Sequence, residues 1–176
     1  FNEWNMQGIR FDTLQLIKQK LHESSSWTHT HSRDSVTIGK SRTNDEIRQI
    51  VESNGQVSHQ RKARSELTRR AFAISKQVKR TWSIKLSKQI ESPVDISIVD
   101  FGTQYIHNVI TRNRERDSFI HTSGRWRIDL TIVNQNGVRN FEIEVEYLPD
   151  AIKSVSYLQN ILRLILGTIH SFDGDV

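Results

Sequence analysis

The sequence contains no cysteine, and it has only two prolines and one methionine among its 176 residues. The absence of cysteine excludes disulfide bonds and zinc sites built from thiolates, and it leaves the redox compartment open. No apolar run approaches the roughly 20 residues that a membrane-spanning helix needs. The sequence therefore predicts no such helix.

Charge of one sign is in modest excess. Lysine and arginine number 25 against 20 aspartates and glutamates, which gives a formal net charge of +5 and a pI near 9.7. This balance favours anionic partners, but it is equally compatible with proteins that bind no nucleic acid. The length suits a single domain with one core.

Two segments have the apolar spacing of helices. The first follows Asp12, a suitable N-cap, and places on one face Leu14, Ile17 and Leu21. The second begins at Asp150, directly after Pro149, and carries on one face Ile152, Val155, Leu158, Leu162, Ile165 and Ile169. We expect both helices to cover the core.

Most of the chain between these helices alternates with a period of two. The expected strands are 25–31, 34–39, 46–52, 57–65, 68–76, 81–91, 104–116, 125–133 and 139–147. Many short strands with helices at the ends predict an α+β fold that is mostly antiparallel β, either a barrel or a sandwich.

The last two strands carry charge on one face only. Glu142, Glu144 and Glu146 alternate with apolar residues, and the preceding strand alternates in the same way with Arg127, Asp129 and Thr131. A turn at residues 136–137 can place both polar faces on the same side of a sheet. A solvated face is the simpler interpretation of either strand alone. However, three glutamates on one face would repel one another without a cation between them.

Other strands carry basic faces. Arg112, Arg114 and Arg116 share one side of their strand, Lys62 and Arg64 share another, and Lys85 lies on the polar face of 81–91. If the apolar faces pack outward under helices, the charged faces meet inside a barrel of about eight strands. Carboxylates that hold a divalent cation, beside guanidinium groups that bind phosphate, would form a phosphoryl-transfer site.

The order of these motifs resembles one family. The pattern Arg114-Glu115-Arg116, then Arg127-Ile128-Asp129-Leu130-Thr131, then Glu142-Ile143-Glu144-Val145-Glu146 is similar to the last three tunnel strands of the metal-dependent RNA triphosphatases of fungi, protists and large DNA viruses. These enzymes belong to the triphosphate tunnel metalloenzymes. Upstream, Ser87-Lys88-Gln89-Ile90-Glu91-Ser92-Pro93-Val94 and Lys62-Ala63-Arg64 resemble two further tunnel strands.

The resemblance implies an eight-stranded triphosphate tunnel with helices outside, and a role for each charged group. Mg²⁺ or Mn²⁺ would be held by Glu144 and Glu146, with Glu142 on a metal-bound water or a tunnel arginine. The phosphates would contact Arg64, Arg114, Arg116, Lys62 and Lys85. Glu91 would orient or deprotonate the attacking water, and the site would be braced by Arg127, Asp129 and Thr131.

The implied activity is hydrolysis of the γ-phosphate of triphosphate-ended RNA, the first step of mRNA capping. The implied partners are this RNA and a guanylyltransferase, either as a separate subunit or as a following domain, and no membrane. The implied location is intracellular, in the nucleus of a cell or in the particle or cytoplasmic factory of a virus. Two alternatives remain open: a tunnel enzyme that acts on tripolyphosphate or polyphosphate, and an inactive tunnel that binds polyanions.

The chain departs from the family pattern at one place. The family completes its metal site with a Glu-x-Glu strand near the N-terminus, and Glu3 alone does not supply this pair. We therefore expect a single tunnel domain over 1–176 whose first strand lies upstream of residue 1.

Overall fold

The computed structural model describes residues 2–7, 10–41, 45–63, 71–74, 82–88, 90–94 and 106–148. The second expected helix, after Asp150, and the predicted phosphate-binding Arg64 lie outside these residues. In the described part of the chain no helix is long and apolar enough to cross a membrane.

The described strands form one antiparallel sheet of ten strands in the order β5-β6-β1-β10-β9-β8-β2-β3-β4-β7. Their bounds are β1 Asn2–Gln7, β2 Trp27–Ser41, β3 Glu46–Glu52, β4 Val57–Ala63, β5 Ala71–Ile74, β6 Trp82–Lys88, β7 Ile90–Pro93, β8 Ile106–His121, β9 Trp126–Gln135 and β10 Val138–Tyr147. The predicted fold class, mostly antiparallel β with a helix outside, is confirmed. The described sheet has β5 and β7 at its two edges.

Strand β2 is longer than the sequence indicated. The segments 25–31 and 34–39 belong to one continuous strand, β2, which pairs along nearly its whole length with β8. The interruption that suggested two strands falls at Ser32-Arg33, where both residues continue the ladder opposite Arg116 and Glu115. A register shift between Ile38 and Lys40 is the only irregularity in the described pairing of β2 with β8.

The β9–β10 hairpin has the predicted register. Its turn uses two residues with positive φ, Asn136 at 51° and Gly137 at 77°, which is the backbone of a tight hairpin turn. Glu144 consequently lies opposite Asp129, and Glu146 lies opposite Arg127. The polar faces of the two strands are therefore on the same side of the sheet, as predicted.

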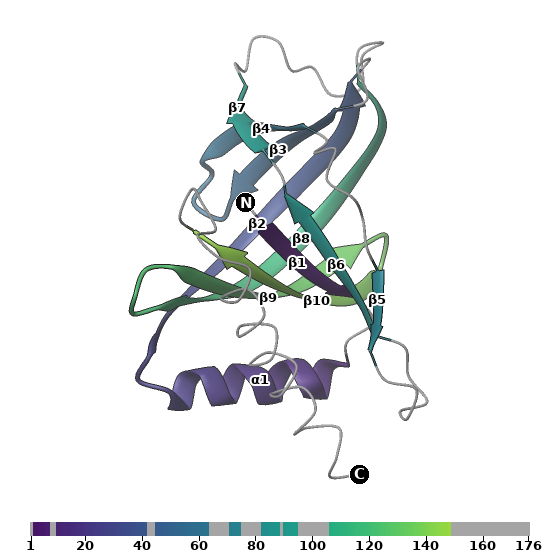
Figure 1. Ribbon diagram of the computed structural model, residues 1–176. Helices are drawn as coiled ribbons and strands as arrows, with labels where there is room; N and C mark the ends of the chain where they lie inside the picture. The colour runs from purple at the N-terminus through teal and green to yellow at the C-terminus, as the bar shows by residue number, and fades with distance from the viewer. Residues whose placement is uncertain are drawn as a thin grey trace.

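Helix α1 (Phe11–Glu23) covers the opposite, apolar side. It buries Leu14 and Ile17, and its first residue stacks on Phe141 of β10 with ring centroids 5.4 Å apart. Figure 1 shows α1 lying along this side of the sheet, near β9 and β10. The helix begins two residues earlier than expected, because Arg10 and not Asp12 occupies the N-cap position. Asp12 lies instead in the first turn, where a carboxylate favours the helix dipole.

The core under α1 consists of the outward-facing residues of the central strands. The buried residues on this side are Phe119, Trp126, Leu130, Ile143 and Val145. Their burial accounts for the apolar half of each strand's alternating pattern. The charged half is left on the other side of the sheet.

Candidate functional site

The side of the sheet opposite α1 carries the predicted charged residues, and we call it the charged face. Its members are Arg112, Arg114 and Arg116 of β8, Arg127, Asp129 and Thr131 of β9, and Glu142, Glu144 and Glu146 of β10. Cross-strand register sets their order, because Arg116 lies opposite Thr131, which lies opposite Glu142. These arginines and carboxylates therefore occupy neighbouring positions on three adjacent strands.

Asp129 is the central acid of the charged face. Its side chain is only 2% exposed, and its Oδ2 lies 3.1 Å from Arg127 Nε and 3.7 Å from Arg116 Nη1. Its other oxygen, Oδ1, is buried without a hydrogen-bond partner. A carboxylate this deeply buried needs cations beside it. Arg127 and Arg116 supply these cations, and both contact Oδ2.

The arginines also connect to the acidic strand. Arg116 donates from Nε to Thr131 Oγ1 at 3.3 Å, and its Nη2 lies 4.0 Å from Glu144 Oε2. Arg127 forms an ion pair with Glu146. Glu142, by contrast, has no hydrogen bond or ion pair within the described part of the chain, so its carboxylate is free to accept a ligand.

Arg114 and Arg112 are held by other strands. Arg114 donates from Nε and Nη2 to the two carboxylate oxygens of Asp34, at 2.7 and 2.8 Å. Arg112 donates from Nε to Gln135 Oε1 at 2.8 Å. Asp34 was not predicted from the sequence. Its signal was available in the alternation of β2, where Asp34 is the one acid on the face of the arginines.

A second charged cluster lies on β2, β3 and β4. Glu46 accepts a 2.6 Å hydrogen bond from Arg48 Nε and lies 3.6 Å from Lys40 Nζ. Burial raises the pKa of Glu46, but Arg48, Lys40 and Lys62 outweigh this and hold the pKa below its ordinary value. The carboxylate therefore stays ionised beside these cations. Arg48 and Lys40 were not predicted.

The remaining predicted residues are placed by backbone register. Lys62 is buried on β4 and lies opposite both Glu46 and Glu91. Lys85 on β6 lies opposite Asn5 of β1. Lys62 and Glu91 thus occupy paired positions on neighbouring strands, whereas Lys85 belongs to the other end of the strand order.

The strand beside β10 is β1, which the sequence analysis did not predict. In the ladder, Glu3 lies opposite Glu146 and Asn5 lies opposite Glu144. The place next to the acidic strand is therefore filled by residues 2–7.

Comparisons with known proteins show which solved structures share this fold. No family model and no curated protein matches the sequence. Among solved structures, the RNA triphosphatase domain of the mimivirus mRNA capping enzyme superposes with a TM-score of 0.66 at 15% identity, over 96% of this chain and 88% of that one. The Schizosaccharomyces pombe RNA triphosphatase Pct1 superposes with a TM-score of 0.61 at 16% identity, over 96% and 83%.

The chain has the triphosphate tunnel fold. A third structure of this fold, a Hippeastrum protein described as a putative adenylyl cyclase with a dominant triphosphatase activity, superposes with a TM-score of 0.57 at 12% identity, over 94% of this chain and 86% of that one. At these identities the likeness concerns the fold.

The charged face of this triphosphate tunnel fold offers oxygen donors that suit a hard divalent cation. Among the described residues Glu142 has no hydrogen bond or ion pair and Asp129 Oδ1 is buried without a hydrogen bond, which fits a site that a bound ion would complete. In the described part of the chain no three acidic or histidine side chains converge on one point. A cation here would therefore take further oxygens from water or a phosphate, as Mg²⁺ commonly does.

Proposed function

We propose that the protein is an RNA 5′-triphosphatase that hydrolyses the γ-phosphate of triphosphate-ended RNA, the first step of mRNA capping. The observation that supports this proposal most directly is that the basic side chain of Arg116 lies close to two carboxylates. Its guanidinium lies within 4.0 Å of Glu144 on β10 and 3.7 Å of Asp129 on β9. A phosphate held by this arginine would lie beside carboxylates that can hold a cation.

Basic residues would bind the triphosphate. Arg116 and Arg114 on β8 would contact the γ- and β-phosphates, with Lys62, Lys85 and Arg64 adding positive charge. Arg48 joins this group, because Glu46 fixes its guanidinium on the same cluster as Lys62. Fixed guanidinium groups lose little conformational freedom when they bind phosphate oxygens, and they stabilise the charge of the transferring group.

Acidic residues would hold the cation and the water. Glu144 and Glu146 would bind Mg²⁺ or Mn²⁺, with Glu142 on a metal-bound water, and the ion when bound neutralises charge on phosphate oxygens. Glu91, which lies opposite Lys62 in the sheet, would orient the attacking water or take its proton. Asp129, Thr131 and Arg127 would hold the arginine and glutamate side chains in place.

The partners follow from the same proposal. The substrate would be the 5′ end of nascent RNA, and its product would pass to a guanylyltransferase, as a separate subunit or a linked domain. One mimivirus structure is described as part of a trifunctional mRNA capping enzyme, and Pct1 has been solved in complex with the Spt5 CTD. The first of these descriptions is consistent with a capping partner for the present protein.

The test is the release of γ-phosphate from triphosphate-ended RNA with Mg²⁺ or Mn²⁺, compared between the wild type and Glu144→Gln. Gln keeps the shape of Glu144 but removes the charge that faces Arg116 and the cation. We expect phosphate release to fall at least about a hundredfold, the scale on which lost electrostatic stabilisation acts. Wild-type activity in Glu144→Gln would exclude the assigned role.

Glu115→Gln is the matched control. Glu115 lies on β8 beside Arg116 but on the other face of the sheet, where it pairs with exposed Arg33 at 3.3 Å. We expect this variant to retain activity. A competition between the RNA and inorganic tripolyphosphate decides the substrate class. Preferential hydrolysis of tripolyphosphate at equal concentration would overturn RNA as the substrate. Binding of either one without hydrolysis would overturn the enzymatic proposal.

A further inference from the structure

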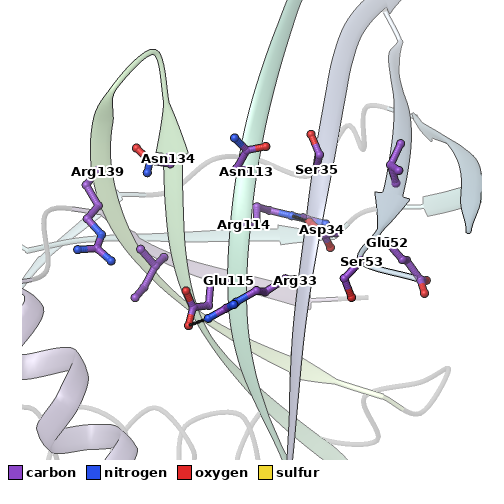
Figure 2. Close-up of a pocket in the computed structure, with 12 residues that line it drawn as sticks. Arg33, Asp34, Ser35, Glu52, Ser53, Asn113, Arg114, Glu115, Asn134 and Arg139 are labelled. Carbon is purple, nitrogen blue, oxygen red and sulfur yellow. Dashed lines mark hydrogen bonds and ion pairs between the residues drawn. The ribbon is translucent and has the colours of Figure 1, made fainter. Parts of the chain in front are cut away.

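Two ion pairs join β2 and β8 at consecutive positions of the same ladder. Asp34 lies opposite Arg114, and Arg33 lies opposite Glu115. Successive residues of a strand point to opposite faces, so the first pair lies on the charged face and the second on the other face. Figure 2 shows both pairs between the same two strands.

The two pairs differ in geometry and burial. Asp34 accepts two hydrogen bonds from Arg114, at 2.7 and 2.8 Å, and the two side chains are 13% and 15% exposed. The Arg33–Glu115 pair has a single bond at 3.3 Å, and its arginine is 66% exposed. Bidentate, mostly buried pairs fix a guanidinium, whereas single exposed contacts contribute little.

Only one arginine of β8 receives a carboxylate from β2. The β2 residues opposite Arg116, Arg114 and Arg112 are Ser32, Asp34 and Val36. Arg116 turns instead toward β9 and β10, where it meets Asp129 and Glu144. Asp34 thus holds Arg114 on the β2 side, away from the carboxylates of β10.

The pair also determines which atoms of Arg114 remain available. Asp34 occupies the edge formed by Nε and Nη2. Among the described residues nothing else accepts the two hydrogens of Nη1 and the second hydrogen of Nη2, so a phosphate oxygen has to approach the end of the guanidinium rather than the side that Asp34 covers. The neighbouring acid, Glu52, faces the turn and accepts from Asn54 at 3.4 Å, which leaves Asp34 as the residue that orients Arg114.

We propose that Asp34 is the positioning residue of Arg114 for the terminal phosphates of the substrate. This inference rests on the proposed function for the identity of the ligand and deepens it. Asp34 fixes the rotamer of Arg114, so that its free end faces the phosphate before binding. The guanidinium then loses less rotational freedom when the ligand arrives.

Calorimetric titration of the whole chain with inorganic tripolyphosphate, without divalent cation, tests this inference by binding alone. Asp34→Asn keeps the shape but removes one charge-assisted acceptor, and we expect affinity to fall about five- to tenfold, the worth of one such bond. Asp34→Glu restores the carboxylate and should recover part of the loss. Asp34→Asn should add nothing to Arg114→Gln, because the aspartate acts through that arginine.

Glu115→Gln serves as the matched control, and we expect it to bind tripolyphosphate like the wild type. In phosphate release from RNA, Asp34→Asn should raise KM more than it lowers kcat. Equal or tighter binding by Asp34→Asn, additive losses in the double variant, or an equal loss in Glu115→Gln would overturn the inference. A wild type that binds tripolyphosphate but releases no phosphate would overturn the proposed function alone.

Discussion

Arg116 and Glu144 lie on strands that are not neighbours, yet Nη2 of the arginine is 4.0 Å from Oε2 of the glutamate. Strand β9 separates β8 from β10 in the sheet. The arginine reaches across it, passing Thr131 and Asp129. Contact over this distance requires long side chains on one face, and it joins the basic and acidic strands into a single site.

Removing the positive charge of Arg116 should abolish most of the phosphate release. We expect Arg116→Gln to lower phosphate release at least about a hundredfold, because the developing charge on the phosphate loses its nearest guanidinium. Arg116→Lys should recover only part of the lost activity. An ammonium group cannot donate the two parallel hydrogen bonds that a planar guanidinium donates to two phosphate oxygens. Arg33→Gln, which alters an exposed arginine of the other face, should leave the rate unchanged.

Asp129→Asn should weaken the fold as well as the site. The substitution leaves Arg116 and Arg127 beside a neutral group in a place that is almost closed to solvent. Breaking a buried ion pair from one side costs about 3 kcal/mol of unfolding free energy, and urea denaturation would measure it. Asp12→Asn is the control, because it removes the ion pair between Asp12 and Arg10, in which the aspartate side chain is 78% exposed. Its effect should stay within about 0.5 kcal/mol, and similar losses in both variants would contradict the central role of Asp129.

The stability of the protein should depend on pH through Asp117, which joins α1 to the sheet. Burial raises the pKa of Asp117, but hydrogen bonds from Lys18, His29 and His31 outweigh it and lower the pKa below its ordinary value. The Lys18 bond is 2.6 Å long. A lowered pKa gives stability that is present above the unfolded value of about 3.9 and is lost as pH falls through the folded value.

Asp117→Asn should therefore lower the melting temperature at pH 7. The gap between the melting temperatures of variant and wild type should narrow below about pH 4, because the carboxyl of the unfolded chain takes up a proton there before the carboxyl of the folded protein does. Thermal unfolding followed by circular dichroism at pH 7 and at successively lower pH would measure this gap. A difference that stays constant from neutral to acid pH would contradict a contribution from the ionised carboxylate.

Gly137→Ala should destabilise the hairpin that sets the register of the acidic strand. Its φ of 77° lies in the left-handed region, where a side chain costs about 1 kcal/mol. Nothing lies within 4 Å of the position a Cβ would take, so the cost is conformational. Gly137→Asn should cost less, because asparagine tolerates this region. Chemical denaturation of both variants would test the order, and equal losses would contradict the conformational explanation.

The sequence was most informative where alternation is regular. The faces of β9 and β10, and the turn at Asn136 and Gly137, could be predicted, because a period of two assigns each residue to a side and the turn fixes the register. It was least informative at β1 and at Arg48. Six residues of mixed character in β1 form a strand only because β10 and β6 pair with them on both sides.

The sequence by itself determined which residues share a face, since the geometry of an extended chain dictates this locally. It could not determine which carboxylate each arginine meets. Arg114 pairs with Asp34, 80 positions away, while Arg116 turns to Asp129 and Glu144. These choices depend on strand order and on register between distant segments, which pairing across the whole sheet decides and no local pattern encodes.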